Sequence, residues 1–157
     1  IRLPTVMVRP GRPNKAASSF VTAIVREPLL GLSTDCPVPP DFAVWICSPR
    51  SAMEWLLHAA TMDTGPLGID RGINPPGRSA TVAKMLEALA AVAGNEARDK
   101  VGFVFDREVH DIVAGWPAAF TATRARRLGF TEQEPLEDLV RAFIADDLAA
   151  TRTERGL

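Results

Sequence analysis

The sequence predicts an α/β fold. Short blocks rich in β-branched and other apolar residues alternate with longer blocks in which apolar residues recur at helical spacing. The 13 prolines separate these blocks from one another. The strand material is thin, because about four short strands accompany about five or six helices in this interpretation.

The first predicted strand covers residues 1–8, where β-branched and apolar side chains predominate. Prolines and a glycine in residues 9–15 predict a loop, because they interrupt both the helical and the strand period. Asn14 is the expected N-cap of a helix over residues 16–26. Pro28 is expected to end that helix.

The centre of the chain carries the clearest helix signal. Residues 33–42 are proline-rich and predict a short extended segment, and residues 43–47 predict an apolar strand. Ser48 followed by Pro49 is typical of a helix start, because serine caps free backbone amides and proline fits the first helical position. This helix is expected to stop before Gly65.

The second half is predicted to be mainly helical. The expected elements are a helix from Thr81 to Ala93, a strand at residues 101–105, short helices at 108–114 and 122–128, and a final helix from near Pro135. We expect the polar tail, residues 151–157, to be frayed.

Composition narrows the class of protein. The 157 residues, 46% of them hydrophobic, suffice for one soluble domain with a hydrophobic core. A formal net charge of −1 argues against a nucleic-acid or membrane-surface partner, and no apolar run is long enough to span a bilayer. Two cysteines and two histidines are too few for a disulfide scaffold or a zinc site, so we expect a cytoplasmic protein without a metal.

Most of the side chains that could take part in catalysis or ligand binding are expected to have structural roles. Gly65, Gly68 and Gly72 follow a helix instead of a strand, so they predict a connecting loop and no phosphate-binding fingerprint. We expect Cys47 to be an inert core thiol, and His58 to be a packing or helix-face residue. The remaining candidates are interpreted as charges at the surface or at helix ends: His110, Glu132, Glu134, Asp146, Asp147, Arg124, Arg126 and Arg127. For the three arginines, a contact with a phosphate remains an alternative.

The segment RLPTVMVRPGRPN is the best candidate for a ligand site. Ligands of open α/β sheets bind outside the carboxyl ends of the strands. Arg9 and Arg12 follow the first predicted strand, and their planar guanidinium groups can grip a carboxylate or a phosphate. A proline-stiffened turn with solvated arginines is the alternative, and both remain open at this point.

The order of the blocks resembles the C-terminal half of an extended short-chain dehydrogenase/reductase. The segments that carry the resemblance are RLPTV, AVWICSPRSAMEWLLHAA, INPPGRSATVAKMLEALAAVAG and FTATRARRLGFTEQEPLEDLVRAFI. The resemblance implies the last strands of a parallel Rossmann sheet plus a small mixed α/β substrate-binding domain. Residues 1–14 and 43–62 would belong to the Rossmann sheet, and the rest of residues 15–157 to the substrate-binding domain.

Two segments, RLPTVMVRPGRPNKAASSF and VWICSPRSA, are similar to the D-erythronate dehydrogenase subgroup, often labelled nucleoside-diphosphate-sugar epimerases. This resemblance implies an NAD-dependent oxidation of the 2-hydroxyl of a small sugar acid to a 2-oxo acid. It implies that Leu3, Pro4 and Thr5 contact the cofactor. Arg9, Asn14 and Ser19 would surround the substrate.

The family's glycine-rich loop, its catalytic serine or threonine and its Tyr-x-x-x-Lys pair are expected to precede Ile1. The sequence contains no tyrosine, so we expect no catalytic residue in this chain and no activity of the chain alone. An N-terminal Rossmann segment is then the implied partner, with exposed apolar surface where it packs. A homodimer and the choice between NAD and NADP stay open.

Two other functions remain as alternatives. A nucleoside-diphosphate-sugar epimerase of the same family uses similar hydride chemistry. Such relatives commonly carry an arginine near the position of Phe42 and an aspartate pair where Ser48 and Pro49 stand here, so the departures favour a smaller substrate. The third interpretation is a non-catalytic α/β interaction module.

Overall fold

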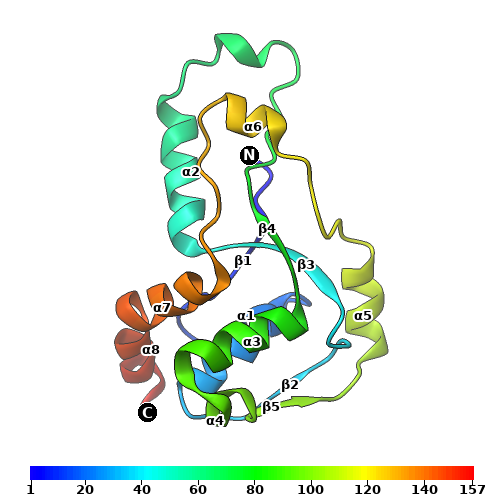
Figure 1. The fold of residues 1–157 in the computed structure, drawn as a ribbon, viewed down its shortest axis with the longest axis vertical. Coiled ribbons are helices and arrows are strands. Elements are labelled where there is room, and N and C mark those ends of the chain that lie inside the picture. Colours follow the sequence, from blue (N-terminus) through cyan, green and yellow to red (C-terminus); the bar gives the residue numbers. More distant parts are fainter.

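Two small sheets organise the chain in this computed structural model, which describes residues 1–157 (Figure 1). The first sheet has the order β1 (Thr5–Val6), β3 (Ala43–Cys47), β4 (Arg78–Thr81). Strands β1 and β3 are parallel, with Thr5 opposite Ile46, whereas β3 and β4 are antiparallel. The second sheet pairs β2 (Thr34–Cys36) with β5 (Val101–Phe103) in parallel.

Helices surround both sheets. They are α1 (Ser19–Leu29), α2 (Pro49–Thr61), α3 (Val82–Ala93), α4 (Asn95–Arg98), α5 (Arg107–Ala114), α6 (Thr123–Arg127), α7 (Leu136–Asp146) and α8 (Leu148–Arg155), with one 3-10 turn at Gly65–Leu67. The predicted α/β class is confirmed. None of these helices has both the length and the apolar character that crossing a bilayer requires.

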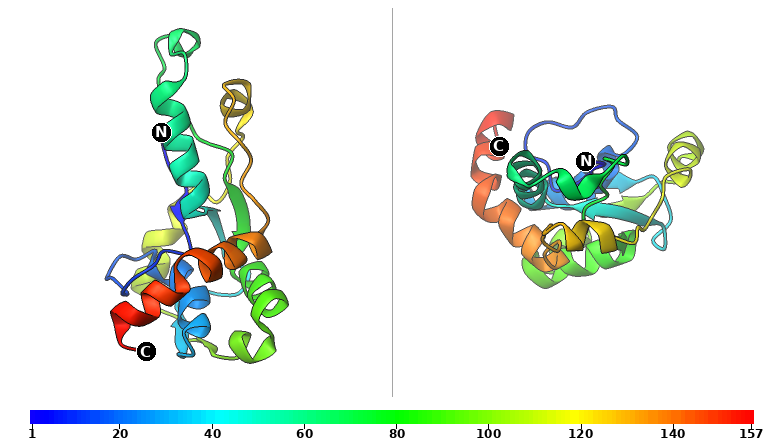
Figure 2. Two further views of the ribbon diagram at one scale, coloured as in Figure 1. Left: turned by 90° about the vertical axis from the view of Figure 1, so that its left-hand side faces the viewer. Right: turned by 90° about the horizontal axis from the view of Figure 1, so that it is seen from above.

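The chain has two hydrophobic clusters. The larger, with 20 buried residues, lies where α1, α3 and α7 pack together, and the smaller, with 8 buried residues, centres on Trp55 of α2. Figure 2 shows the same division, because α2 and the N-terminus project beyond the body formed by α1, α3, α7 and α8. Residues 1–8 run between the two parts, with Val6 at the smaller cluster and Val8 in the larger.

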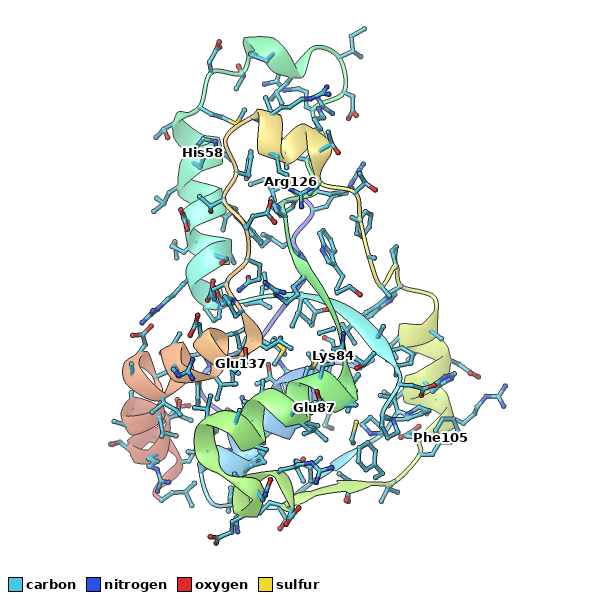
Figure 3. All side chains as sticks on the ribbon, in the orientation of Figure 1. His58, Lys84, Glu87, Phe105, Arg126 and Glu137 are labelled. Atoms are coloured by element: carbon cyan, nitrogen blue, oxygen red, sulfur yellow. The ribbon has the colours of Figure 1, made fainter.

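Local signals predicted the centre of the chain well. Strand β3 covers the predicted residues, and the Ser48 hydroxyl oxygen accepts from the backbone N–H of Ser51 at 3.0 Å, which caps α2. Thr81 caps α3 in the same way, accepting from the N–H of Lys84 at 3.3 Å. His58 is confirmed as a packing residue, because its ring lies edge-on to Phe130 at 4.7 Å; Figure 3 shows its place on α2.

The start and end of the first helix were predicted wrongly. Helix α1 begins at Ser19, and Asn14 does not cap it: the Asn14 Oδ1 accepts from the N–H of Ala16 at 3.1 Å, which closes the preceding turn instead. Pro28 lies inside the last turn and does not end the helix. The chain leaves the helix only near Gly31, whose φ of +87° favours glycine.

The first strand is also shorter than predicted, because β1 is paired only where it lies beside the end of β3. Strand β4 was not expected as a strand at all. Its four residues, RSAT, carry no apolar alternation, and their extended form comes from pairing with β3.

Several charges expected in solvent are paired. Arg50 donates to the two carboxylate oxygens of Asp146 at 2.6 and 2.7 Å, and this partner lowers the pKa of Asp146. Arg126 pairs with Glu132 and lowers the pKa of that carboxyl likewise. Arg124 donates to the Asp70 carboxylate at 2.7 Å and so ties α6 to the loop after α2.

The tail predicted to be frayed is ordered as helix α8. Arg155 Nη1 lies 2.5 Å from a carboxylate oxygen of Glu27 on α1, and both side chains are largely buried. Thr151 is 1% exposed. The polar residues of the tail therefore dock on α1, a contact between distant segments that local polarity does not reveal.

Replacing Arg155 with alanine should lower the free energy of unfolding by about 1–3 kcal/mol, because a buried charged hydrogen bond is lost. The measurement is urea unfolding of the purified protein. Arg98→Ala is the matched control: Arg98 pairs with Asp99 at 3.8 Å on the surface, so its loss should cost under about 0.5 kcal/mol. Equal effects of the two substitutions would contradict the docking of α8.

Candidate functional site

Leu3, Pro4 and Thr5 line an apolar cavity of about 250 Å³. Trp45 of β3 and Phe120 form its aromatic wall, with ring centroids 4.2 Å apart. Parallel pairing of β1 with β3 sets Thr5 opposite Ile46, so the residues just before β1 run beside β3 where both line the cavity. The cavity suits a flat, weakly polar group better than a polyol.

Gly77 keeps this cavity in shape. A Cβ at this position would lie 2.5 Å from Trp45 Nε1, 2.6 Å from Pro4 Cγ and 2.9 Å from the carbonyl oxygen of Ile46. Such distances are far inside van der Waals contact, so only glycine allows the segment before β4 to close over Pro4 and Trp45.

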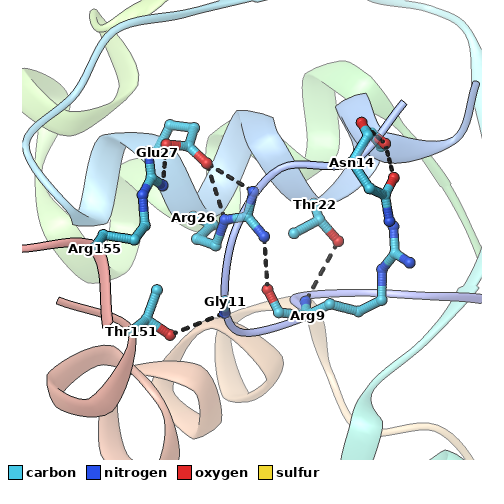
Figure 4. A network of polar contacts seen from close by, with 9 residues as sticks. Arg9, Gly11, Asn14, Thr22, Arg26, Glu27, Thr151 and Arg155 are labelled. Carbon is cyan, nitrogen blue, oxygen red and sulfur yellow. Dashed lines mark hydrogen bonds and ion pairs between the residues drawn. The ribbon is translucent and has the colours of Figure 1, made fainter. Parts of the chain in front are cut away.

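Arg9, Asn14 and Ser19 line a second, separate hollow of about 100 Å³. Its other polar side chains are Arg12, Thr22 and Arg26, and no apolar side chain except the ring of Pro10 lines it. We call this the arginine hollow. Ser19, Thr22 and Arg26 are three and seven residues apart on α1, so they share the helix face that meets the loop after β1 (Figure 4).

The loop after β1 is held between α1 and α8. The N–H of Arg9 donates to Thr22 Oγ1 at 3.3 Å, and Arg26 Nη1 donates to the carbonyl oxygen of Arg9 at 3.1 Å. From the other side, the N–H of Gly11 donates to Thr151 Oγ1 at 3.3 Å. Figure 4 shows these bonds on both sides of the loop, which fix its backbone without using the Arg9 guanidinium.

A shallow groove of about 400 Å³ joins the two places. Its lining residues are Leu3, Pro4, Thr5, Val6, Arg9, Ser18 and Trp116. Of the six residues predicted for the site, four lie on this groove, whereas Asn14 and Ser19 do not line it and lie beyond it in the arginine hollow. Their roles stay predictions.

Several residues of this region were missed, among them Ser18, Thr22, Arg26 and Trp116. The polar spacing of Ser19, Thr22 and Arg26 along one helix was a readable signal for Arg26. Trp116 lies in the segment after α5 and reaches β1 only through the tertiary fold, so the sequence carried no local signal for it. Ser18 likewise belongs to no motif that would have marked it in the sequence.

The region offers binding groups but no evident proton acceptor. Burial, with a smaller effect of Glu134, raises the pKa of the Cys47 thiol to about 12, so it stays protonated near neutrality. These 157 residues include no tyrosine. No three histidine, cysteine, aspartate or glutamate side chains gather closely enough to hold a metal ion.

No family model matches the chain. It is 45% identical over 146 residues to D-erythronate dehydrogenase of Cupriavidus necator, covering 93% of this chain and 45% of that protein. It is 40% identical to D-erythronate dehydrogenase of Haemophilus influenzae, covering 94% of this chain and 47% of that one.

The resemblance to D-erythronate dehydrogenases is confirmed. The chain spans about half the length of the curated relatives it matches. A solved structure named nucleoside-diphosphate-sugar epimerase, from Agrobacterium tumefaciens, is 42% identical, with a TM-score of 0.89 over 94% of this chain and 43% of its own.

More distant structures support the fold alone. A GalE-like L-threonine dehydrogenase from Cupriavidus necator is 19% identical, with a TM-score of 0.80 over 93% of this chain and 46% of its own. The predicted fold, part of a Rossmann-type extended short-chain dehydrogenase, is therefore confirmed.

Replacing Gly77 with alanine should lower the free energy of unfolding by about 1–3 kcal/mol, because the added methyl forces Pro4 and Trp45 apart. Tryptophan fluorescence reports the changed surroundings of Trp45, and urea unfolding measures the loss of stability. Gly115→Ala is the control, since the nearest atom to an added Cβ there is 3.7 Å away. If both variants unfold like the parent protein, Gly77 does not shape the cavity.

Proposed function

We propose that this chain forms the substrate-binding part of an NAD-dependent dehydrogenase that oxidises the 2-hydroxyl of a small sugar acid, such as D-erythronate, to the 2-oxo acid. The identity of 45% over 146 residues to a D-erythronate dehydrogenase carries the proposal. The groove that runs from Thr5 to Arg9 supports it, because it offers an apolar end and a cationic end to one ligand.

Leu3, Pro4 and Thr5 form the cofactor side of the proposed site. The proline and aromatic lining of the cavity fits one face of a planar nicotinamide ring. NAD, when bound, supplies the hydride acceptor, and most of its contacts come from residues outside this chain. Thr5 holds the substrate hydroxyl next to this face.

Arg9 orients the acid in this proposal, with Asn14 and Ser19 nearby. A guanidinium presents parallel N–H donors that match the two oxygens of a carboxylate. The group that removes the hydroxyl proton also lies outside this chain, so the role of these residues is to bind and align the substrate.

The partner of this chain is the nucleotide-binding half of the same enzyme. Residues 1–14 and 43–62 contribute to its sheet in this proposal, and the remainder of residues 15–157 forms the substrate domain. Strand β1 lies at the edge of its sheet, open to a further strand. Both cysteines are buried and free, which suits a cytoplasmic enzyme.

An exposed apolar face on helix α2 is further support for such a partner. The inner face of α2 buries Trp55, yet its outer face exposes Met53, Leu56 and Leu57 at helical spacing, with Leu57 61% exposed. A helix that is apolar on both faces belongs between two layers. We therefore propose that the nucleotide-binding half packs on this outer face.

Activity of the full-length protein tests the proposed reaction. Formation of NADH with D-erythronate is expected, and Arg9→Ala should raise KM about tenfold or more, because a charged hydrogen bond is lost. Arg98→Ala serves as control. Conversion of a sugar nucleotide without net NADH would favour the epimerase instead, and the absence of either reaction would favour a non-catalytic module.

Thiol labelling of the full-length protein tests the packing on α2. The thiol introduced by Leu57→Cys should react slowly, because the partner half covers it, whereas the one from Glu87→Cys, at an exposed position on α3, should react quickly. Cys36 and Cys47 are 0% exposed and give little background. Equal labelling rates would refute the covered face.

A further inference from the structure

The arginine hollow carries an excess of positive charge. Three guanidinium groups line it, those of Arg9, Arg12 and Arg26, and no carboxylate does. Its volume of about 100 Å³ is several times what a single water requires. A polar hollow of one charge sign, with room inside, is the arrangement expected of an anion site.

Arg26 is the deepest of the three, with 3% of its surface exposed. It pairs with Glu27 at 2.8 Å, but Glu27 also pairs with Arg155 at 2.5 Å. One carboxylate thus serves two buried guanidinium groups, which leaves part of their charge uncompensated.

Arg9 and Arg12 have no carboxylate partner. The Arg9 Nε is buried and has no hydrogen-bond acceptor in the protein, a state that costs free energy unless a ligand or solvent supplies one. Arg12 donates only to a neutral acceptor, the carbonyl oxygen of Glu154, at 3.2 Å. Both side chains therefore keep their capacity to bind an anion.

Asn14 adds a neutral donor. Its Oδ1 already accepts from the N–H of Ala16 and from the hydroxyl of Ser19. This fixes the orientation of the carboxamide and leaves its Nδ2 amide as the free group. The hollow consequently presents three guanidinium groups and this amide as donors, and no carboxylate as an acceptor.

We infer that the arginine hollow binds the oxoanion of the substrate, with Arg12 and Arg26 acting together with Arg9. Arg9 lines both the hollow and the groove, so a carboxylate bound at the mouth of the hollow lies next to the groove that would hold the rest of a small sugar acid. The identity of the ligand as a sugar acid rests on the proposed function. The existence of an anion site rests only on the lining of the hollow.

The experiment uses the full-length protein with two probes, inorganic phosphate and D-erythronate. Arg12 is exposed, so Arg12→Ala should fold normally. The substitution should weaken the binding of D-erythronate, which is measured as a rise of KM of about tenfold. It should also weaken the binding of phosphate, measured as a rise of about tenfold in its competitive inhibition constant. Arg98→Ala, remote from the hollow, should change neither constant.

Three results separate the inference from the proposed function. Unchanged constants for both probes in Arg12→Ala and Arg9→Ala would overturn the inference. Weaker phosphate binding with unchanged KM for the sugar acid would also overturn it, since the hollow would then hold an anion other than the substrate's. Phosphate binding that depends on Arg12, in a protein that oxidises no sugar acid, would refute the proposed function and keep the anion site.

Discussion

The buried guanidinium of Arg26 is the contact on which the polar half of the site depends. It donates to the carbonyl oxygen of Arg9 and pairs with Glu27, which in turn pairs with Arg155. A charge with so little solvent contact is stable only while its partners remain in place. Helix α1, the loop after β1 and helix α8 therefore behave as one unit, and the terminal helix stabilises the loop that carries Arg9.

The apolar half depends on backbone geometry. Parallel pairing of β1 with β3 sets Pro4 close to Trp45, and Gly77 packs against both without a side chain of its own. The two halves lie along one short segment, because only three residues lie between Thr5 and Arg9. Few rearrangements can move one half without moving the other.

The elements predicted from the sequence are those with local causes. Ser48 and Pro49 start α2, and the apolar run before them forms β3, since capping and hydrophobic burial act over neighbouring residues. Strand β4 and the docking of α8 depend on distant partners, so composition did not reveal them. The same holds for the site: Arg9 and Arg12 stand out in the sequence, whereas the burial of Arg26 and the reach of Trp116 follow from tertiary contacts.

The contrast in polarity between the two halves limits how a ligand can lie. A sugar acid would leave its hydroxyls without partners in the aromatic cavity, and a nicotinamide ring would meet almost only polar and charged side chains in the arginine hollow. One arrangement satisfies both: the ring faces Pro4 and the aromatic wall, and the acid extends along the groove toward Arg9. In the proposed function, the reacting carbon lies between the apolar cavity and Arg9, where cofactor and substrate would meet.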